Sequence, residues 1–169
     1  MNYEKLFTPM KIGKMEVKNR LSFSPMGTNS AFTNGRKDEQ EIDYFIRRAK
    51  GGVGMIVNGC QMLNEAIAQG SMEGYLDSYT VLPALTSMVD GVHRYGARII
   101  CQISPGTGRN AFPDTNGNPP MSASAIPSAF DPNVICHALT KDEISNIMKM
   151  TEFAAGVARD AGYDGIEIH

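Results

Sequence analysis

Four short apolar segments of the chain end in small or polar residues that could contact one planar, polar ligand. Ser24-Pro25-Met26-Gly27 follows the first segment, where backbone groups and a glycine would let a flat ring approach closely. Asn58-Gly59-Cys60 ends the second segment, again with small side chains. Gln102 lies in the third and carries an amide that both donates and accepts, which suits a ring with adjacent C=O and N–H groups. His169 ends the fourth and could donate a hydrogen bond to a substrate carbonyl oxygen.

Each of these residues alone has a simpler explanation. Gly27 and Gly59 would serve equally well as turn residues, and Gln102 could bridge backbone groups inside a barrel. A single histidine at a strand end carries little information. Agreement among the four segments is what favours a shared site, because each segment delivers a polar or small group at the same end.

The segments that carry these residues alternate with amphipathic helical stretches, an order that predicts a parallel sheet. Parallel neighbours need a crossover, which is usually a helix, and reactive groups then gather at the carboxyl ends of the strands. We expect strands in residues 21–25, 54–59, 98–104 and 165–169, and helices over 38–50, 78–95 and 140–161. Successive right-handed crossovers predict an α/β fold, half of an eight-stranded (β/α)8 TIM barrel. Alternation over residues 10–17 predicts a hairpin that covers the amino-terminal mouth.

Capping residues and apolar stripes support the three helices. Asp38 is the expected N-cap of the first helix, and Thr140 with Glu143 forms a capping box at the third. We expect Met88, Met148 and Met150 to pack in the core, since methionine fills irregular gaps. The predicted inward stripe of the third helix is Ile144, Ile147 or Met148, Thr151, Ala155 and Ala158.

Residues 105–139 form the least regular part of the chain and hold six of its nine prolines. A loop of this length inside a compact domain is usually functional or disordered. Because it leaves the carboxyl end of the third predicted strand, we expect it to cover the substrate.

Composition excludes several classes of protein. The net charge of −2 argues against a nucleic-acid or membrane-surface partner, which would require a basic face. The three cysteines form no CxxC motif, which favours a reducing cytoplasm over a disulfide framework, and no Cys or His lies at metal-ligand spacing. The first residues lack the apolar core of a signal peptide, and no apolar run is long enough for a membrane span.

Several motifs lie in order along the chain: Leu6-Phe7-Thr8-Pro9, residues 17–21, Ser24-Pro25-Met26, residues 47–54 and residues 161–169. At these motifs the chain resembles the Old Yellow Enzyme family of flavin-dependent oxidoreductases, and the resemblance covers nearly the whole chain. Residues 103–110 and the proline-rich loop are most similar to the branch of dienoyl-CoA reductases and bacterial bile-acid oxidoreductases.

The resemblance implies a TIM barrel that holds FMN at its C-terminal mouth. Ser24, Pro25, Met26 and Gly27 would pass along the isoalloxazine, largely through backbone groups. Cys60 matches a small residue near the flavin, and Gln102 matches an amide at the pyrimidine edge. His169 matches the first member of a His-x-x-His or His-x-x-Asn pair that grips the substrate carbonyl or polar groups on the flavin side. The implied reaction is hydride transfer from NADH or NADPH to FMN, then to an activated C=C bond of an enone or enoyl substrate.

Two departures from the family pattern and the extent of the chain limit this interpretation. Gly27 stands where some relatives carry a cysteine that tunes the flavin, and Asn29 where some carry a substrate-contacting tyrosine. The second member of the histidine pair and the phosphate site would lie beyond residue 169. We therefore expect residues 1–169 to be the N-terminal half of a flavin-binding barrel that is inactive alone. In the larger relatives, 4Fe–4S and FAD modules follow the barrel, and either arrangement is compatible with this sequence. The alternative is an inactive half-barrel that acts as a binding or self-assembly module, and a homo-oligomer is compatible with both.

Overall fold

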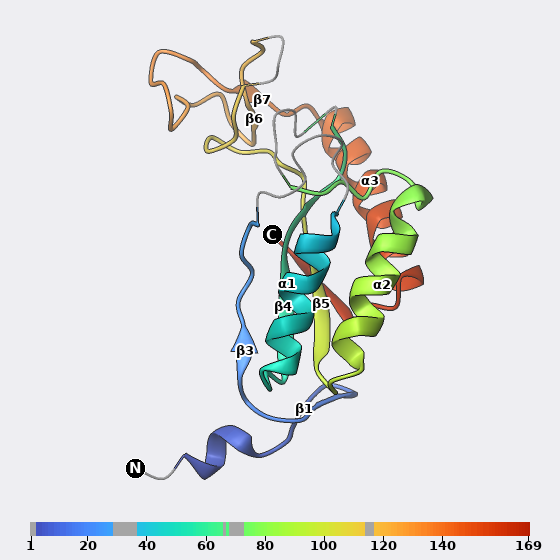
Figure 1. Cartoon of the computed structure of the whole chain (residues 1–169). Helices are drawn as coiled ribbons and strands as arrows, with labels where there is room; N and C mark the ends of the chain where they lie inside the picture. Colours follow the sequence, from blue (N-terminus) through green and yellow to red (C-terminus); the bar gives the residue numbers. More distant parts are fainter. Residues whose placement is uncertain (1–2, 29–36, 66, 68–72, 114–116) are drawn as a thin grey trace.

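The computed structural model describes residues 3–28, 37–65, 67, 73–113 and 117–169, and is built around one parallel sheet. Its four strands lie in the order β3-β4-β5-β8. Three helices cross over between them, and all three contribute to a single apolar cluster with the strands (Figure 1). The strands are β3 (Ser22–Phe23), β4 (Met55–Met62), β5 (Arg98–Ser104) and β8 (Gly165–Ile168), and the helices are α1 (Glu39–Lys50), α2 (Leu82–His93) and α3 (Lys141–Asp160). The predicted order of strands and helices is confirmed.

Alternation along the strands divides the sheet into a face covered by the helices and a face turned away from them. In register, Ile56 pairs with Ile99, and both side chains are completely buried beneath the helices. Cys101 and Ile103 continue this buried row along β5. Residues of the opposite parity, such as Gln102, therefore line the inner face of the half-barrel.

Both predicted helix caps are present. The Asp38 carboxylate accepts the backbone N–H of Glu41 at 2.8 Å, so α1 begins where the sequence predicted. At α3, the Glu143 carboxylate accepts the Thr140 backbone N–H at 2.7 Å, which completes the capping box. This bond, with hydrogen bonds from His137 and from the Thr140 hydroxyl, lowers the pKa of Glu143 to about 2.

Two sequence predictions about the helices need correction. The predicted 78–95 helix is split into a 3-10 turn, η2 (Tyr79–Val81), and α2, with Pro83 in the first turn of α2. In α3 the completely buried residues are Ala154, Val157 and Ala158, while Ile144 and Met148 are 44% and 67% exposed.

The physical reason for the exposed residues of α3 is its length. A helix of 20 residues is about 30 Å long, whereas the seven residues of β5 span about 23 Å. Only the second half of α3 lies over the strands, and its first turns extend beyond their carboxyl ends (Figure 1). An apolar stripe indicates which side of a helix is apolar, but not how far the helix extends past its sheet.

The N-terminal segment covers the amino end of the sheet. After a short 3-10 helix, η1 (Glu4–Phe7), strands β1 (Met10–Ile12) and β2 (Met15–Val17) form the predicted antiparallel hairpin. Lys18 Nζ donates to the backbone oxygen of Tyr95 at 2.5 Å, and Arg98 Nε donates to that of Glu16 at 3.0 Å. These bonds attach the hairpin segment to the end of α2 and the start of β5.

Within the proline-rich region, residues 105–113 and 117–139 belong to an arm that rises from the carboxyl end of β5 (Figure 1). Two short parallel strands, β6 (Met121–Ser122) and β7 (His137–Ala138), order its described part. Phe112 and Phe130 stack with ring centroids 4.7 Å apart and an interplanar angle of 12°. The arm therefore has internal structure, and its predicted substrate-covering role stays a prediction. None of the helices in the described part of the chain is long and apolar enough to cross a membrane.

Asp164, just before β8, joins three elements at the amino end of the sheet. Its carboxylate accepts the backbone N–H of the fully buried Ile99 at 2.8 Å and the guanidinium of Arg98 at 3.0 Å. The same carboxylate lies 2.7 Å from Nε2 of His93 at the end of α2. One side chain thus holds the starts of β5 and β8 against the end of α2.

We predict that Asp164→Ala lowers the free energy of unfolding by about 1–3 kcal/mol, because the buried N–H of Ile99 loses its acceptor. Urea unfolding followed by circular dichroism measures this change. Asp160→Ala is the matched control, since its ion pair with Arg159 is exposed and should contribute less than about 1 kcal/mol. Equal effects of the two substitutions would show that Asp164 has no special role.

Candidate functional site

The structure places the predicted site residues at the carboxyl end of four neighbouring parallel strands. Residues 24–27 follow directly after β3, and Cys60 and Gln102 lie in the second halves of β4 and β5. His169 follows β8, and its backbone N–H donates to the carbonyl of Ile103 at 2.9 Å. Since neighbouring parallel strands end at one edge of a sheet, these groups line one edge of the half-barrel.

Gly59 lets the segment after β3 lie against β4. A Cβ added at residue 59 would overlap the main chain of Met26, so no larger residue fits without moving that segment. The Met26 side chain itself is half exposed. Backbone rather than side-chain atoms of residue 26 therefore contact the sheet, which leaves this segment as a main-chain surface at the strand ends.

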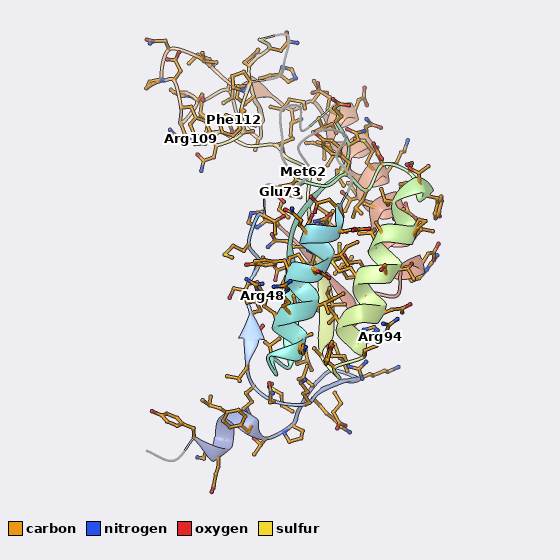
Figure 2. All side chains as sticks on the ribbon, viewed as in Figure 1. Arg48, Met62, Glu73, Arg94, Arg109 and Phe112 are labelled. Carbon is orange, nitrogen blue, oxygen red and sulfur yellow. The ribbon has the colours of Figure 1, made fainter. Side chains whose placement is uncertain are left out.

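Gly27 lies directly beneath the carboxylate of Glu73. A Cβ at residue 27 would overlap Glu73 Oε1, so the carboxylate occupies space that a side chain at residue 27 would fill. Glu73 comes from the connection between β4 and α2, and Figure 2 shows it near Met62 at the carboxyl end of the sheet. A negative charge therefore reaches the edge where the candidate residues gather.

Cys60 lies in an irregularity of β4, where the register with β5 shifts between Asn58 and Gln61. Partial burial raises the pKa of its thiol, and the negative charge of Glu73 raises it further. A hydrogen bond with Ser104 acts in the opposite direction, because the hydroxyl stabilises the thiolate. Cys60, Glu73 and Ser104 are thus electrostatically connected, and the thiol is the protonated form at neutral pH.

Gln102 is nearly buried, at 5% exposure, and its orientation is fixed by Glu167. Gln102 Nε2 donates to Glu167 Oε1 at 2.5 Å, and the two residues are directly paired in the β5–β8 ladder. With its nitrogen committed to the carboxylate, the amide keeps its oxygen and one N–H for a ligand. That pair of groups matches the edge of a ring with adjacent N–H and C=O.

His169 lies on the same face as Glu167, since side chains alternate along a strand. Both residues are exposed, and alternation also sets Ser104 on the inner face with Gln102. The inner face of the sheet thus has a row formed by Gln102 and Glu167, followed toward the carboxyl end by Ser104 and His169.

Asn58 does not join this site, contrary to the sequence-based interpretation of Asn58-Gly59-Cys60 as a strand end. β4 continues to Met62, and Asn58 is completely buried opposite Cys101 on the helix-covered face. Its Oδ1 accepts the hydroxyl of Tyr163 at 2.8 Å, and its Nδ2 has no partner within the described residues. Asn58 is a buried polar group of the core, and burial raises the pKa of Tyr163 well above its usual value.

Three residues of the site were missed by sequence reasoning: Glu73, Ser104 and Glu167. Glu167 and Ser104 could have been found from alternation, because each is two residues from a predicted site residue on the same strand face. Glu73 had no such signal, because it lies in an irregular connection. Asn29, the other departure noted in the sequence, lies outside the described residues.

The residues at this edge fit a planar heterocycle such as a flavin. Gly59 and Gly27 leave a surface of main chain after β3 on which a flat ring could lie. Gln102 offers an oriented acceptor and donor. The arm holds a cavity of about 360 Å³ with a mixed polar and apolar lining that includes Gly106, Phe112 and His137.

The chain is similar to known flavin-dependent oxidoreductases. A profile of the NADH:flavin oxidoreductase / NADH oxidase family matches residues 5–169. Cinnamate reductase of Clostridium sporogenes is 35% identical over 172 residues, covering 99% of this chain and 26% of that protein. NADH:acrylate oxidoreductase of Vibrio harveyi is 31% identical over 156 residues, covering 92% of this chain and 15% of that protein.

A solved structure extends the comparison to three dimensions. The old yellow enzyme homologue from Zymomonas mobilis matches with a TM-score of 0.84 and 25% identity, covering 98% of this chain and 48% of that one. The predicted TIM-barrel fold class is therefore confirmed. The chain spans about a quarter of the length of the cinnamate reductase and about half of that structural neighbour.

We predict that Gly59→Ala lowers the free energy of unfolding by about 1–3 kcal/mol, because the new methyl group would displace the main chain of Met26. Gly156→Ala is the control: it lies in α3 with no neighbour near its Cβ position, and should stabilise the protein by about 0.5–1 kcal/mol. Chemical denaturation of both variants measures the difference. Destabilisation of both variants to the same extent would contradict the proposed close contact.

Proposed function

Because the chain belongs to the NADH:flavin oxidoreductase / NADH oxidase family, we propose that residues 1–169 form the N-terminal half of the FMN-binding barrel of an ene-reductase. The protein would reduce the C=C bond of an α,β-unsaturated carbonyl substrate with electrons from NADH or NADPH. The observation that carries this proposal is the oriented amide of Gln102 on the same edge of the sheet as the main-chain surface of residues 24–27. Relatives named for cinnamate and acrylate support the substrate class.

The residues that would hold FMN are Ser24, Pro25, Met26, Gly27, Cys60 and Gln102. When bound, FMN would supply the hydride carrier between the nicotinamide and the C=C bond. Gln102 would bind the pyrimidine edge through its oxygen and free N–H, while Glu167 holds the amide in that orientation. Cys60, kept protonated by burial, would add no charge of its own.

His169 would act on the substrate rather than on the cofactor. Its imidazole would donate a hydrogen bond to the substrate carbonyl oxygen, where negative charge grows as hydride reaches the β-carbon. The arm would cover the substrate, since it leaves the carboxyl end of β5 and holds a cavity lined in part by Phe112 and Met121. These residue roles rest on geometry and on the family relationship together.

The exposed isoleucine side chains of β8 support the half-barrel interpretation. Ile166 and Ile168 are 45% and 62% exposed, although their parity matches the buried Cys101 and Ile103 of β5. Further helices and strands of a complete barrel would cover them. Because the chain spans only 26% of the cinnamate reductase, the full-length protein would have space for 4Fe–4S and FAD modules after the barrel. The three free cysteines favour a cytoplasmic protein.

We predict that the full-length protein purifies with FMN, is reduced by NADH or NADPH, and is reoxidised by an enoate such as cinnamate. Stopped-flow absorbance of the flavin band measures both half-reactions. Residues 1–169 alone should show no turnover, because the phosphate site of such barrels uses loops after later strands. A colourless, stable oligomer of the full-length protein would instead support the alternative assembly module.

His169→Ala in the full-length protein should slow reoxidation by an enone or enoate by about 10²–10³-fold, because one hydrogen-bond donor to the developing charge is lost. Reduction by the nicotinamide should change much less. His169→Asn keeps an N–H donor and should retain more of the rate. Wild-type rates for both half-reactions of His169→Ala would leave His169 without a catalytic role.

A further inference from the structure

The carboxylate of Glu73 enters the candidate site from a connection that sequence reasoning did not include. We propose that Glu73 is a further cofactor-facing residue, which takes the place of a side chain at residue 27 and lowers the reduction potential of the bound flavin. This inference rests on the proposed function, because it assumes that the edge formed by Gly27, Cys60 and Gln102 holds a flavin.

The sheet fixes the backbone next to Glu73. The N–H of Met62, the last residue of β4, donates to the carbonyl of Gly74 at 2.8 Å. The N–H of Leu76 donates back to the carbonyl of Met62 at 2.9 Å, and Tyr75 forms a parallel bridge with Met62. These bonds extend the β4 ladder to the connection, so the position of residue 73 follows from the position of the strand end.

The absence of a side chain at Gly27 gives the carboxylate its position. Glu73 Oε1 lies where a Cβ of residue 27 would be, so any larger residue at 27 would displace the carboxylate. Gly27 belongs to the main-chain segment that Gly59 holds against β4. The main chain next to Glu73 is thus held by the end of β4, and its carboxylate lies in the space that Gly27 leaves open.

The charge of Glu73 also acts on the inner row of the site. It disfavours the thiolate of Cys60, which raises the pKa of that thiol in addition to the larger effect of burial. Gly27 lies in the segment that follows β3, and Cys60 lies in the neighbouring strand β4, so a carboxylate that affects both is close to the surface assigned to the flavin.

A fixed negative charge at this position has a direct redox consequence. Two-electron reduction of a flavin adds negative charge to the ring at neutral pH, and a nearby carboxylate opposes that charge. Because the carboxylate is partly buried, salt screens it less than it would screen an exposed side chain. Glu73 should thus favour the oxidised flavin and make the reduced flavin a stronger donor.

The first test compares Glu73→Gln with Glu65→Gln in the full-length, FMN-loaded protein. Both substitutions remove one negative charge from the same connection, but Glu65 is exposed. Glu73→Gln should change the ratio of reduced to oxidised flavin at a fixed potential about tenfold, an upward shift of about 30 mV for a two-electron couple. Glu65→Gln should leave the midpoint potential unchanged. Equal midpoint potentials for Glu73→Gln, Glu65→Gln and wild type would overturn the proposal.

A second readout, the reactivity of Cys60, needs no flavin. Glu73→Gln should lower the pKa of Cys60 and accelerate its alkylation at pH 8, whereas Ser104→Ala should raise the pKa and slow alkylation. Peptide mass mapping separates Cys60 from Cys101, whose pKa burial raises to about 12. If Glu73→Gln leaves the alkylation rate of Cys60 unchanged, the Glu73 carboxylate is too far from Cys60 to act on this site, and the proposal is contradicted.

The two readouts also distinguish failure of this inference from failure of the proposed function. A protein that binds no FMN contradicts the proposed function and, with it, the redox role of Glu73. A protein that binds FMN, with a midpoint potential insensitive to residue 73, contradicts only the inference. Glu73→Asp keeps the charge and should remain near the wild-type potential, so a large shift in this variant would indicate a steric role instead.

Discussion

The close approach of two main chains at Gly59 is the contact on which the carboxyl edge of the sheet depends. β3 has only two ladder residues, so pairing with β4 alone gives the following segment little support. The missing side chain at residue 59 lets the backbone of Met26 lie against β4. Gly27 is thereby held under Glu73.

The two ends of the sheet have different tasks. At the amino end, Asp164, the hairpin and the end of α2 are linked by hydrogen bonds that hold these elements together. At the carboxyl end, carboxylates, an amide and a thiol lie on the open inner face. Barrel enzymes commonly divide stability and chemistry in this way, since loops at one end can vary without loss of the core.

The sequence predicted those parts of the fold whose signals are local. Asp38 and Thr140 mark helix starts because a cap is a contact within four residues, and the strands follow from short apolar runs. The extension of β4 to Met62 was not predictable, because its irregularity at Cys60 interrupts the alternation. Glu73 and the pairing of Asn58 with Tyr163 depend on contacts between residues far apart in the chain, which no local pattern encodes.

The arm is attached to the barrel by two ends of unequal stiffness. Its exit is anchored, because Glu143 of α3 binds both Thr140 and His137 of β7. Its entrance passes from Ser104 to Gly106, a glycine with φ of 72° whose backbone N–H donates to the Ser104 hydroxyl oxygen at 3.1 Å. If the arm moves, the backbone dihedral angles at its entrance would therefore change most. The arm would rotate as a unit about its anchored exit at the start of α3.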